Sequence, residues 1–340
     1  MTARTPLLSD IIELSVIDDK ILQIKYIQFH PKVNILTYSY QLNKSLFKDV
    51  MEKLSLMGHN RDSLLKDLKL IGELIYKLFF FDSDGHRISI MDSLFSGNHN
   101  LSLFFNGEIE HIPFELAYNG RDFISLKRQI TRHVPTNDLS EKDSSDGPIE
   151  SLLVIGDPCA NSTNSYNESI NLFNSLKSTC QPAIKRLEYL SKELNCLEFQ
   201  DILERYDLIH YAGHGEYHPE SGGTLLIGKN TTFKASDLLS ISNPPRLIFL
   251  NACLIAKTAT GGRESLIHKL LKLGVTNIIA SDWLILDEDF SSFLNVIYHS
   301  IFSGMTVGQS FLDAKRKSFT SGSHQWVYFS LYGSPTTVLY

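Results

Sequence analysis

The chain contains few cysteines, and their spacing excludes two common kinds of cysteine site. Only four of its 340 residues are cysteine, and no two of them have the C-x-x-C spacing that is typical of zinc sites and redox disulfides. Cys159, Cys180, Cys196 and Cys253 are therefore expected to be free thiols. Such thiols favour a reducing, cytoplasmic setting.

Charge and hydrophobic runs exclude further classes of partner. The formal net charge is -6, with 32 basic and 38 acidic residues, so no broad positive field would draw the protein onto nucleic acid or an anionic membrane. No uncharged apolar run approaches the roughly 20 residues of a membrane span, and the first residues lack the apolar core of a signal peptide. With 43% hydrophobic residues, we expect a globular protein with a substantial core and no direct nucleic-acid or membrane partner.

The N-terminal part of the sequence predicts strands and a helix. Residues 21–29 and 33–40 alternate as a pair of strands does, and residues 100–105 form a short apolar strand. Apolar residues recur at spacings of three and four over residues 62–80, which predicts a core-facing helix. We assign residues 1–137 to a β-rich and helical region that packs on or extends the following sheet. The polar residues 138–150, which include a Gly-Pro pair, predict a linker or an exposed loop.

The pattern changes from residue 151 onward. Residues 151–155, 208–211, 246–250 and 276–280 are short apolar runs without alternation, as is typical of strands buried on both faces of a parallel sheet. Helical patterns at 184–197, 263–272 and 290–302 lie between or after them. This order predicts that residues 151–340 form an α/β domain, with an open, mostly parallel sheet flanked by helices and ligands at the carboxyl ends of its strands.

Two of these predicted strands end in residues suited to nucleophilic chemistry. His214 follows one strand in a Gly-His-Gly turn, and Cys253 follows another after Asn-Ala. A thiol that attacks a carbonyl needs an imidazole nearby, which takes the thiol proton and later returns it to the leaving group. Gly213 and Gly215 allow the backbone to turn sharply. The amide of Gly215, together with that of Cys253, is our candidate for stabilising the oxyanion.

These residues resemble the CHAT domain of the caspase-like cysteine peptidases, a group that also includes the separases. The likeness covers roughly residues 75–340 and includes Pro-Phe-Glu-Leu at residues 113–116, the Ala-Ser-Asp-Trp stretch at 280–283 and Gly-Ser-Pro at 333–335. It implies a caspase-like fold and a peptidase that uses His214 and Cys253 without metal or organic cofactor. Leu254 departs from the pattern, because many relatives carry a small or acidic residue at that position.

The likeness to separases also implies an acidic S1 pocket, which selects a basic residue before the scissile bond. The segment that begins at Trp283 resembles this stretch, with Asp287 as the first candidate and Asp282 and Asp289 close behind. A carboxylate that awaits an Arg or Lys side chain would explain an acid in this place. The same acids can instead cap the helix that begins near residue 290.

Four other polar residues have both a structural and a functional interpretation. His210 lies within its strand, which favours a core histidine, although it is also the main rival to His214 as the base. Glu115 favours a structural hydrogen bond, and Cys159 favours an inert thiol. His218 is expected at the surface.

The family resemblance implies limited proteolysis of a protein partner in bacterial antiviral defence or cell death. The substrate would be a gasdermin-like or another effector, and a separate sensor or activator subunit would trigger the cut. One rival function is a non-catalytic caspase-like scaffold that binds a peptide in its cleft, and another is acyl transfer other than proteolysis. A pure scaffold does not need both His214 and Cys253, which favours the peptidase.

Overall fold

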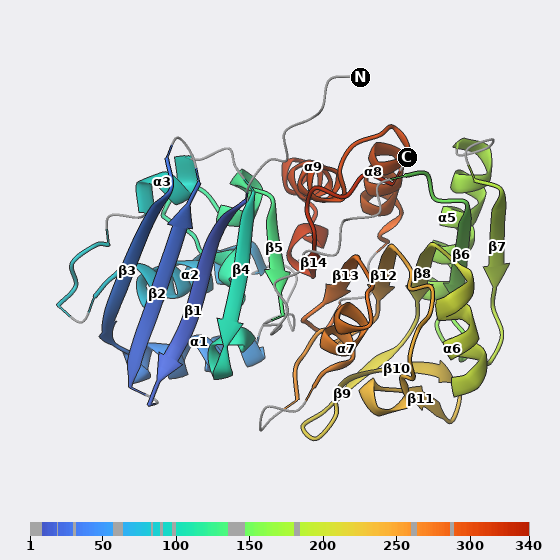
Figure 1. The fold of residues 1–340 in the computed structure, drawn as a ribbon, viewed down its shortest axis with the longest axis horizontal. Coiled ribbons are helices and arrows are strands. Elements are labelled where there is room, and N and C mark those ends of the chain that lie inside the picture. Colours follow the sequence, from blue (N-terminus) through green and yellow to red (C-terminus); the bar gives the residue numbers. More distant parts are fainter. Residues whose placement is uncertain are drawn as a thin grey trace. The chain divides into compact units, whose positions relative to one another are not determined.

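The computed structural model describes residues 9–18, 20–29, 32–56, 64–82, 84–88, 91–96, 100–134, 147–179, 184–259, 264–285 and 289–339. The chain forms two compact units, Met1–Pro135 and Thr136–Tyr340, coloured blue to teal and green to red in Figure 1. Of the predicted linker at 138–150, residues 138–146 lie outside the described residues. Residues 147–150 belong to the second unit, where the Ile149 amide donates to the Leu339 carbonyl at 3.0 Å.

The first unit is built on a sheet with the strand order β3-β2-β1-β4-β5. The pairs β1–β2 and β2–β3 are antiparallel, whereas β1–β4 and β4–β5 are parallel. Leu22, Ile24 and Tyr26 are buried on one face of β2, and the helices lie on one side of this sheet in Figure 1. Its elements are β1 (Asp10–Ile17), β2 (Ile21–Gln28), β3 (Asn34–Gln41), α1 (Lys44–Leu56), α2 (Leu64–Phe80), α3 (Met91–Ser96), β4 (Leu101–Asn106), α4 (Ile124–Lys127) and β5 (Ile130–His133).

The predicted strands at 21–29, 33–40 and 100–105 and the helix at 62–80 correspond to β2, β3, β4 and α2. The sequence pattern did not identify β1, although Ile12 and Leu14 alternate with less buried neighbours in it. α2 packs beneath β3, where the Tyr40 hydroxyl donates to the Phe79 carbonyl at 2.8 Å. The apolar face of α2 and the buried residues of β1, β2 and β4 contribute to the core of this unit.

The second unit contains a sheet with the strand order β14-β13-β12-β8-β6-β7. Its strands are parallel except for β14, which pairs antiparallel with β13. Every residue of β6, β8, β12 and β13 is buried, which confirms the prediction of strands covered on both faces. The elements are β6 (Ser151–Gly156), α5 (Thr163–Thr179), β7 (Arg186–Leu190), α6 (Cys196–Arg205), β8 (Leu208–Ala212), β9 (Gly215–His218), β10 (Gly222–Gly228), β11 (Thr231–Phe233), β12 (Leu247–Asn251), α7 (Leu266–Lys272), β13 (Asn277–Ser281), α8 (Ser291–Phe302), α9 (Val307–Thr320) and β14 (Phe329–Gly333).

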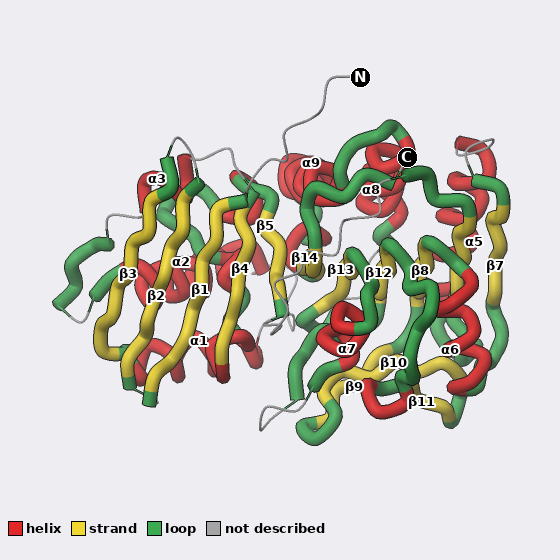
Figure 2. The backbone as a smooth tube through the Cα atoms, viewed as in Figure 1, coloured by secondary structure: helices red, strands yellow, loops and turns green. Residues whose placement is uncertain are grey.

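Different helices cover the two faces of this second sheet. The rings of His210 and Phe249 pack against Tyr298 of α8 on one face. Tyr211 and Leu250, one position further along the same strands, belong to the core that α6 and α7 complete on the other face. A separate antiparallel sheet, β9-β10-β11, lies near α6 and α7, as Figure 2 shows. The unit is therefore a helix–sheet–helix sandwich, as the predicted fold class requires.

One predicted helix is wrong. Residues 184–197 do not form a single helix, because Arg186–Leu190 is the edge strand β7 and α6 begins only at Cys196. Leu187, Leu190 and Leu194 have helical spacing, but two of them lie in β7 and the third in the loop after it. The helix start is set by the Asn195 side chain, which accepts from the Glu198 amide at 2.9 Å in a capping box.

The predicted helices at 263–272 and 290–302 correspond to α7 and α8. Among the described helices, none is long and apolar enough to cross a membrane.

A buried ion pair stabilises the first unit. The Arg132 guanidinium donates to both carboxylate oxygens of Glu115, at 2.6 and 2.7 Å, and both residues are buried. This bidentate contact confirms the structural interpretation of Glu115. It joins β5 to the short 3-10 helix Phe114–Leu116.

We expect Glu115→Ala to lower the free energy of unfolding by about 3–5 kcal/mol, because it leaves the Arg132 charge buried without its carboxylate. Glu13→Ala is the matched control. It breaks the exposed Lys25–Glu13 pair and should lower this free energy by less than about 1 kcal/mol. Urea titration measures both, and equal losses in the two variants would contradict the structural role of Glu115.

Candidate functional site

The register of two neighbouring strands brings His214 and Cys253 to the same edge of the sheet. β8 and β12 are parallel, and their last paired residues are Ala212 and Asn251. The Gly213 amide continues this pairing by donating to the Asn251 carbonyl at 3.1 Å. His214 and Cys253 each lie two residues beyond the Ala212–Asn251 pair. They therefore occupy equivalent positions at the carboxyl ends of adjacent strands, where open α/β sheets bind ligands.

Gly215 lies directly against the backbone of Cys253. A Cβ atom added at Gly215 would lie 2.4 Å from the Cys253 carbonyl oxygen and 3.2 Å from the Cys253 amide nitrogen. Only a residue without a side chain fits this approach. Gly215 begins β9, so the turn after β8 and the turn after β12 are held in contact. This contact brings together the two residues expected to supply the oxyanion amides.

The His214 backbone is fixed, whereas one nitrogen of its ring is unused. Its carbonyl accepts hydrogen bonds from the Leu226 amide and the Tyr211 hydroxyl, both at 3.1 Å. Its Nε2 is buried and has no hydrogen-bond partner among the residues that the structure describes. A buried imidazole nitrogen without a partner is unfavourable for folding alone.

The Cys253 thiol is partly enclosed by the segment that follows β13. The Ile285 amide donates to Cys253 Sγ at 3.3 Å, and the Leu254 amide donates to the Trp283 carbonyl at 3.0 Å. Burial raises the pKa of Cys253, and the Ile285 amide opposes that rise because it stabilises the thiolate. Leu254 has a left-handed backbone (φ 54°), so the position that departs from the family pattern lies in a sharp turn.

Two of the three acidic S1 candidates, Asp282 and Asp289, lie among the described residues. The Asp282 carboxylate accepts hydrogen bonds from the Ser330 hydroxyl (2.8 Å) and the Tyr332 hydroxyl (3.1 Å), both on β14. Asp289 is exposed and accepts from the Ser291 amide at 2.8 Å, at the start of α8. Asp289 precedes the N-cap residue Phe290, and its bond to the first amide of α8 favours a structural role at the helix start. Asp287 lies outside the described residues.

The remaining polar candidates have structural surroundings. His210 is fully buried, and its Nδ1 lies 2.9 Å from the Tyr298 hydroxyl on the face of the sheet that α8 covers. This contact favours the core interpretation over a role as base. Cys159 is also buried, and burial raises its pKa, which suits an inert thiol. His218 lies beside Glu216, with both side chains more than half exposed.

Sequence reasoning missed two features of this site. One is the Ile285 amide, which reaches Cys253 from 32 residues away and which no side-chain pattern could reveal. The other is a buried contact between Asn251 and Glu168 of α5. Asn251 was within reach of prediction, because it stands two positions before the nucleophile at the end of a buried strand.

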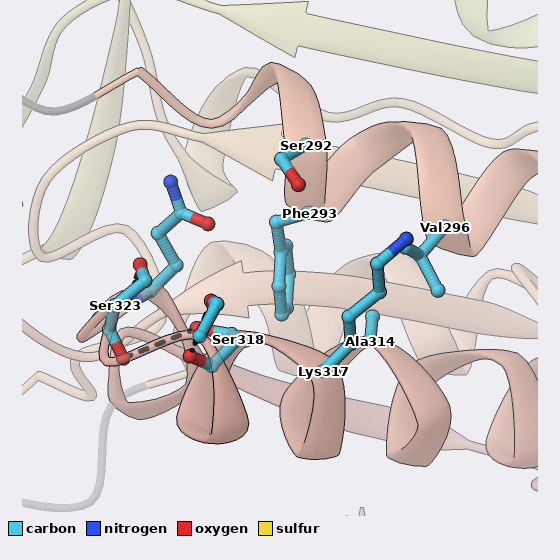
Figure 3. A pocket seen from close by; sticks show the side chains of 9 residues that line it. Ser292, Phe293, Val296, Ala314, Lys317, Ser318 and Ser323 are labelled. Atoms are coloured by element: carbon cyan, nitrogen blue, oxygen red, sulfur yellow. Dashed lines mark hydrogen bonds between the residues drawn. The ribbon is translucent and has the colours of Figure 1, made fainter.

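A small cavity of about 90 Å³ lies between α8 and α9, as Figure 3 shows. Neither His214 nor Cys253 lines it. Its walls are Ser292, Phe293, Val296, Ala314, Lys317, Ser318, Ser321, Ser323 and Gln325. The Ser318 and Ser321 hydroxyls donate to nearby carbonyls, so they are already partnered within the fold.

A group of potential metal ligands occurs in the first unit. Asp82, Asp84 and His86 place one ligand atom each within 4.8 Å of one another. The Asp82 carboxylate accepts the amides of Asp84 and His86 in a surface turn. The group belongs to the turn after α2, and its geometry is explained by those hydrogen bonds.

Solved structures with this fold include cysteine peptidases. Two crystal structures of the Saccharomyces cerevisiae separase–securin complex match 96% and 97% of this chain, with TM-scores of 0.65 and 0.61 and sequence identities of 11% and 10%. The chain spans 30% of each separase chain. The Arg-specific cysteine proteinase gingipain R matches 99% of this chain and 80% of its own, with a TM-score of 0.50 and 11% identity. These likenesses concern the fold.

No curated protein matches the chain. The model of the CHAT domain family matches residues 85–334, which include both strand ends described above. The chain therefore belongs to the CHAT domain family and has the caspase-like fold that it shares with separase and gingipain R.

Proposed function

We propose that this protein is a cysteine endopeptidase in which Cys253 is the nucleophile and His214 the general acid and base. The observation that carries the proposal is the equivalent position of the two residues beyond the Ala212–Asn251 pair. The Nε2 of His214 has no hydrogen-bond partner among the described residues, which supports the proposal, since the nitrogen would be available for the thiol proton. Membership of a family with caspase-like relatives agrees with this chemistry.

The raised pKa of Cys253 determines how the nucleophile is formed. A buried thiol remains protonated near neutral pH, so His214 must remove its proton as the sulfur attacks the peptide carbonyl. The new C–S bond leaves negative charge on the carbonyl oxygen, and the amides of Gly215 and Cys253 stabilise it. The C–N bond then breaks, and His214 gives its proton to the leaving amine. Water hydrolyses the thioester with His214 as base and frees the thiol, without metal or organic cofactor.

A basic residue before the scissile bond is the proposed specificity. Asp287 remains the first candidate for the S1 carboxylate, and Asp282 the second. Two hydroxyls of β14 already bind Asp282, and they would orient its carboxylate for an incoming guanidinium. The preference stated in the name of gingipain R, an Arg-specific proteinase of similar fold, is consistent with this choice.

The proposed setting is limited proteolysis in the cytoplasm. The substrate would be a protein partner, such as a gasdermin-like or another effector of bacterial antiviral defence, and a separate sensor or activator subunit would control the cut. Separase, a protein of similar fold, forms a complex with securin, which is consistent with a protein partner here. Co-expression with a candidate effector tests this setting, and an effector that stays intact would count against it.

Two other functions compete with the peptidase. A non-catalytic scaffold would bind a peptide in the same cleft, and an acyl transferase would pass the thioester to an acceptor other than water. If the protein is a scaffold, it should bind the peptide equally well in the wild type and in Cys253→Ala, and neither protein should release a cleaved product. The transferase predicts a product that carries the acceptor, which mass spectrometry distinguishes from a hydrolysed peptide.

Cys253→Ala should abolish cleavage of a mixed peptide library, with a loss of more than about 10³-fold, because it removes the nucleophile. His214→Ala should lower the rate by about 10²–10⁴-fold. Cys159→Ala, at a buried thiol outside the pair, is the control and should remain active. The cut sites identify the preferred residue before the scissile bond.

Cleavage that persists in Cys253→Ala would disprove the assignment of the nucleophile. If the wild-type protein is inactive alone, the same assay with the products of neighbouring genes separates an enzyme that needs an activator from a binding module.

Alkylation by iodoacetamide should follow a pH profile with a midpoint above that of an ordinary cysteine, because burial raises the pKa of Cys253. Iodoacetamide reacts with the thiolate. A raised pKa lowers the fraction of thiolate at neutral pH, so the midpoint of the alkylation profile moves to higher pH. The other three cysteines are replaced by serine, and the same chain unfolded in urea is the control. A midpoint at or below that of the unfolded chain would contradict a protonated resting thiol.

Gly215→Ala should reduce kcat by about 10²-fold or more, because the added methyl group would lie 2.4 Å from the Cys253 carbonyl oxygen and would displace the oxyanion amides. Gly228→Ala is the matched control in the same small sheet, with its nearest atom at 3.3 Å, and should retain activity. A Gly215→Ala enzyme with wild-type kcat would contradict the oxyanion assignment.

A further inference from the structure

A cluster of buried polar side chains lies beneath the two catalytic strand ends and takes no part in the proposed chemistry. It consists of Glu168 on α5, Asn251 on β12, His210 on β8 and Tyr298 on α8. Glu168 is 5% exposed, Asn251 8% and His210 0%. Removing such groups from water is unfavourable unless they are well partnered, so their presence calls for a role that apolar residues would not perform.

The strongest contact in this cluster joins Glu168 to Asn251. The Asn251 Nδ2 atom donates to Glu168 Oε1 at 2.7 Å, at the short end of the usual range of N–H···O hydrogen bonds. His210 Nε2 lies 3.8 Å from the same oxygen, too far for a hydrogen bond. Asn251 is therefore the residue of β12 that is hydrogen-bonded to Glu168.

Asn251 is the point from which both catalytic turns begin. Its backbone pairs with Ala212 of β8, and its carbonyl accepts the Gly213 amide at 3.1 Å. His214 is the next residue after Gly213, and Cys253 follows Asn251 by two positions. A shift of Asn251 would therefore move the base and the nucleophile relative to each other.

We propose that Glu168 is a positioning residue for the His214–Cys253 pair and that it acts through Asn251. This inference rests on the proposed peptidase function. Glu168 is held on α5, a helix of 17 residues that packs against β6, β7 and β8. The helix provides a rigid anchor, and the side-chain hydrogen bond transmits its position to the end of β12. The geometry of the pair is thus supported from beneath the sheet.

The same cluster contains a matched control. The Tyr298 hydroxyl bonds to His210 Nδ1 at 2.9 Å, and this contact is as deeply buried as the first. It joins α8 to the middle of β8 and does not reach Asn251. Tyr298→Phe thus removes a buried hydrogen bond from the same region without touching the end of β12.

The test compares kcat and KM on an Arg-containing peptide for Glu168→Ala, Asn251→Ala, the double variant, Glu168→Gln and Tyr298→Phe. We expect Glu168→Ala and Asn251→Ala each to lower kcat by about 10–100-fold with less than about threefold change in KM, because misplaced reacting groups slow the chemical step. The double variant should lose no more than the worse single variant. Glu168→Gln keeps an acceptor oxygen and should restore most of kcat, and Tyr298→Phe should stay within about twofold of wild type.

A second readout does not depend on peptidase activity. Loosening the turn should expose the thiol, so Glu168→Ala and Asn251→Ala should each alkylate Cys253 at least about threefold faster at neutral pH than wild type or Tyr298→Phe. Unchanged alkylation and kcat in Glu168→Ala would overturn the positioning role, as would additive losses in the double variant. If wild type does not cleave even with the products of neighbouring genes, but the alkylation rates separate as expected, the peptidase fails and the positioning of Cys253 by Glu168 stands.

Discussion

The parallel hydrogen bonding between β8 and β12 is the constraint on which the site depends. Parallel strands end at the same edge of a sheet, and the pairing of Ala212 with Asn251 sets the two ends level. The same number of residues then leads to His214 on one strand and to Cys253 on the other. A slip of register would separate the two side chains along the edge. The strands are buried on both faces, so the core itself fixes their register.

Burial around these strand ends determines the chemistry available to them. The thiol is partly enclosed and its pKa is raised, while the His214 ring keeps a buried nitrogen without a partner among the described residues. An ion pair prepared in advance would require the opposite shift for the thiol. In the proposed mechanism the thiol instead starts protonated and gives up its proton when the carbonyl arrives. The Ile285 amide on the sulfur moderates the effect of burial.

In the second unit, the strands that are buried on both faces could be predicted, because they appear in the sequence as short apolar runs. Residues 208–211 and 246–250 showed this pattern, and each pointed to the candidate catalytic residue beyond its end. Residues 184–197 misled because Leu187, Leu190 and Leu194 have helical spacing in an edge strand and its loop. The Ile285 amide and the Glu168–Asn251 bond depend on distant segments that only the folded chain brings together. Local sequence carries no signal for such contacts.

The most direct test of the account is the pH-dependent labelling of the protein by an acyloxymethyl ketone probe that carries Arg, with the adduct located by peptide mapping. If His214 and Cys253 form a catalytic pair, the probe should form an adduct on Cys253 of the wild-type protein near neutral pH. The same adduct should form at least about 10²-fold more slowly in His214→Ala. Equal rates in the two proteins, or an adduct on Cys159 or Cys196 in place of Cys253, would contradict the claim that the two strand ends form one catalytic site.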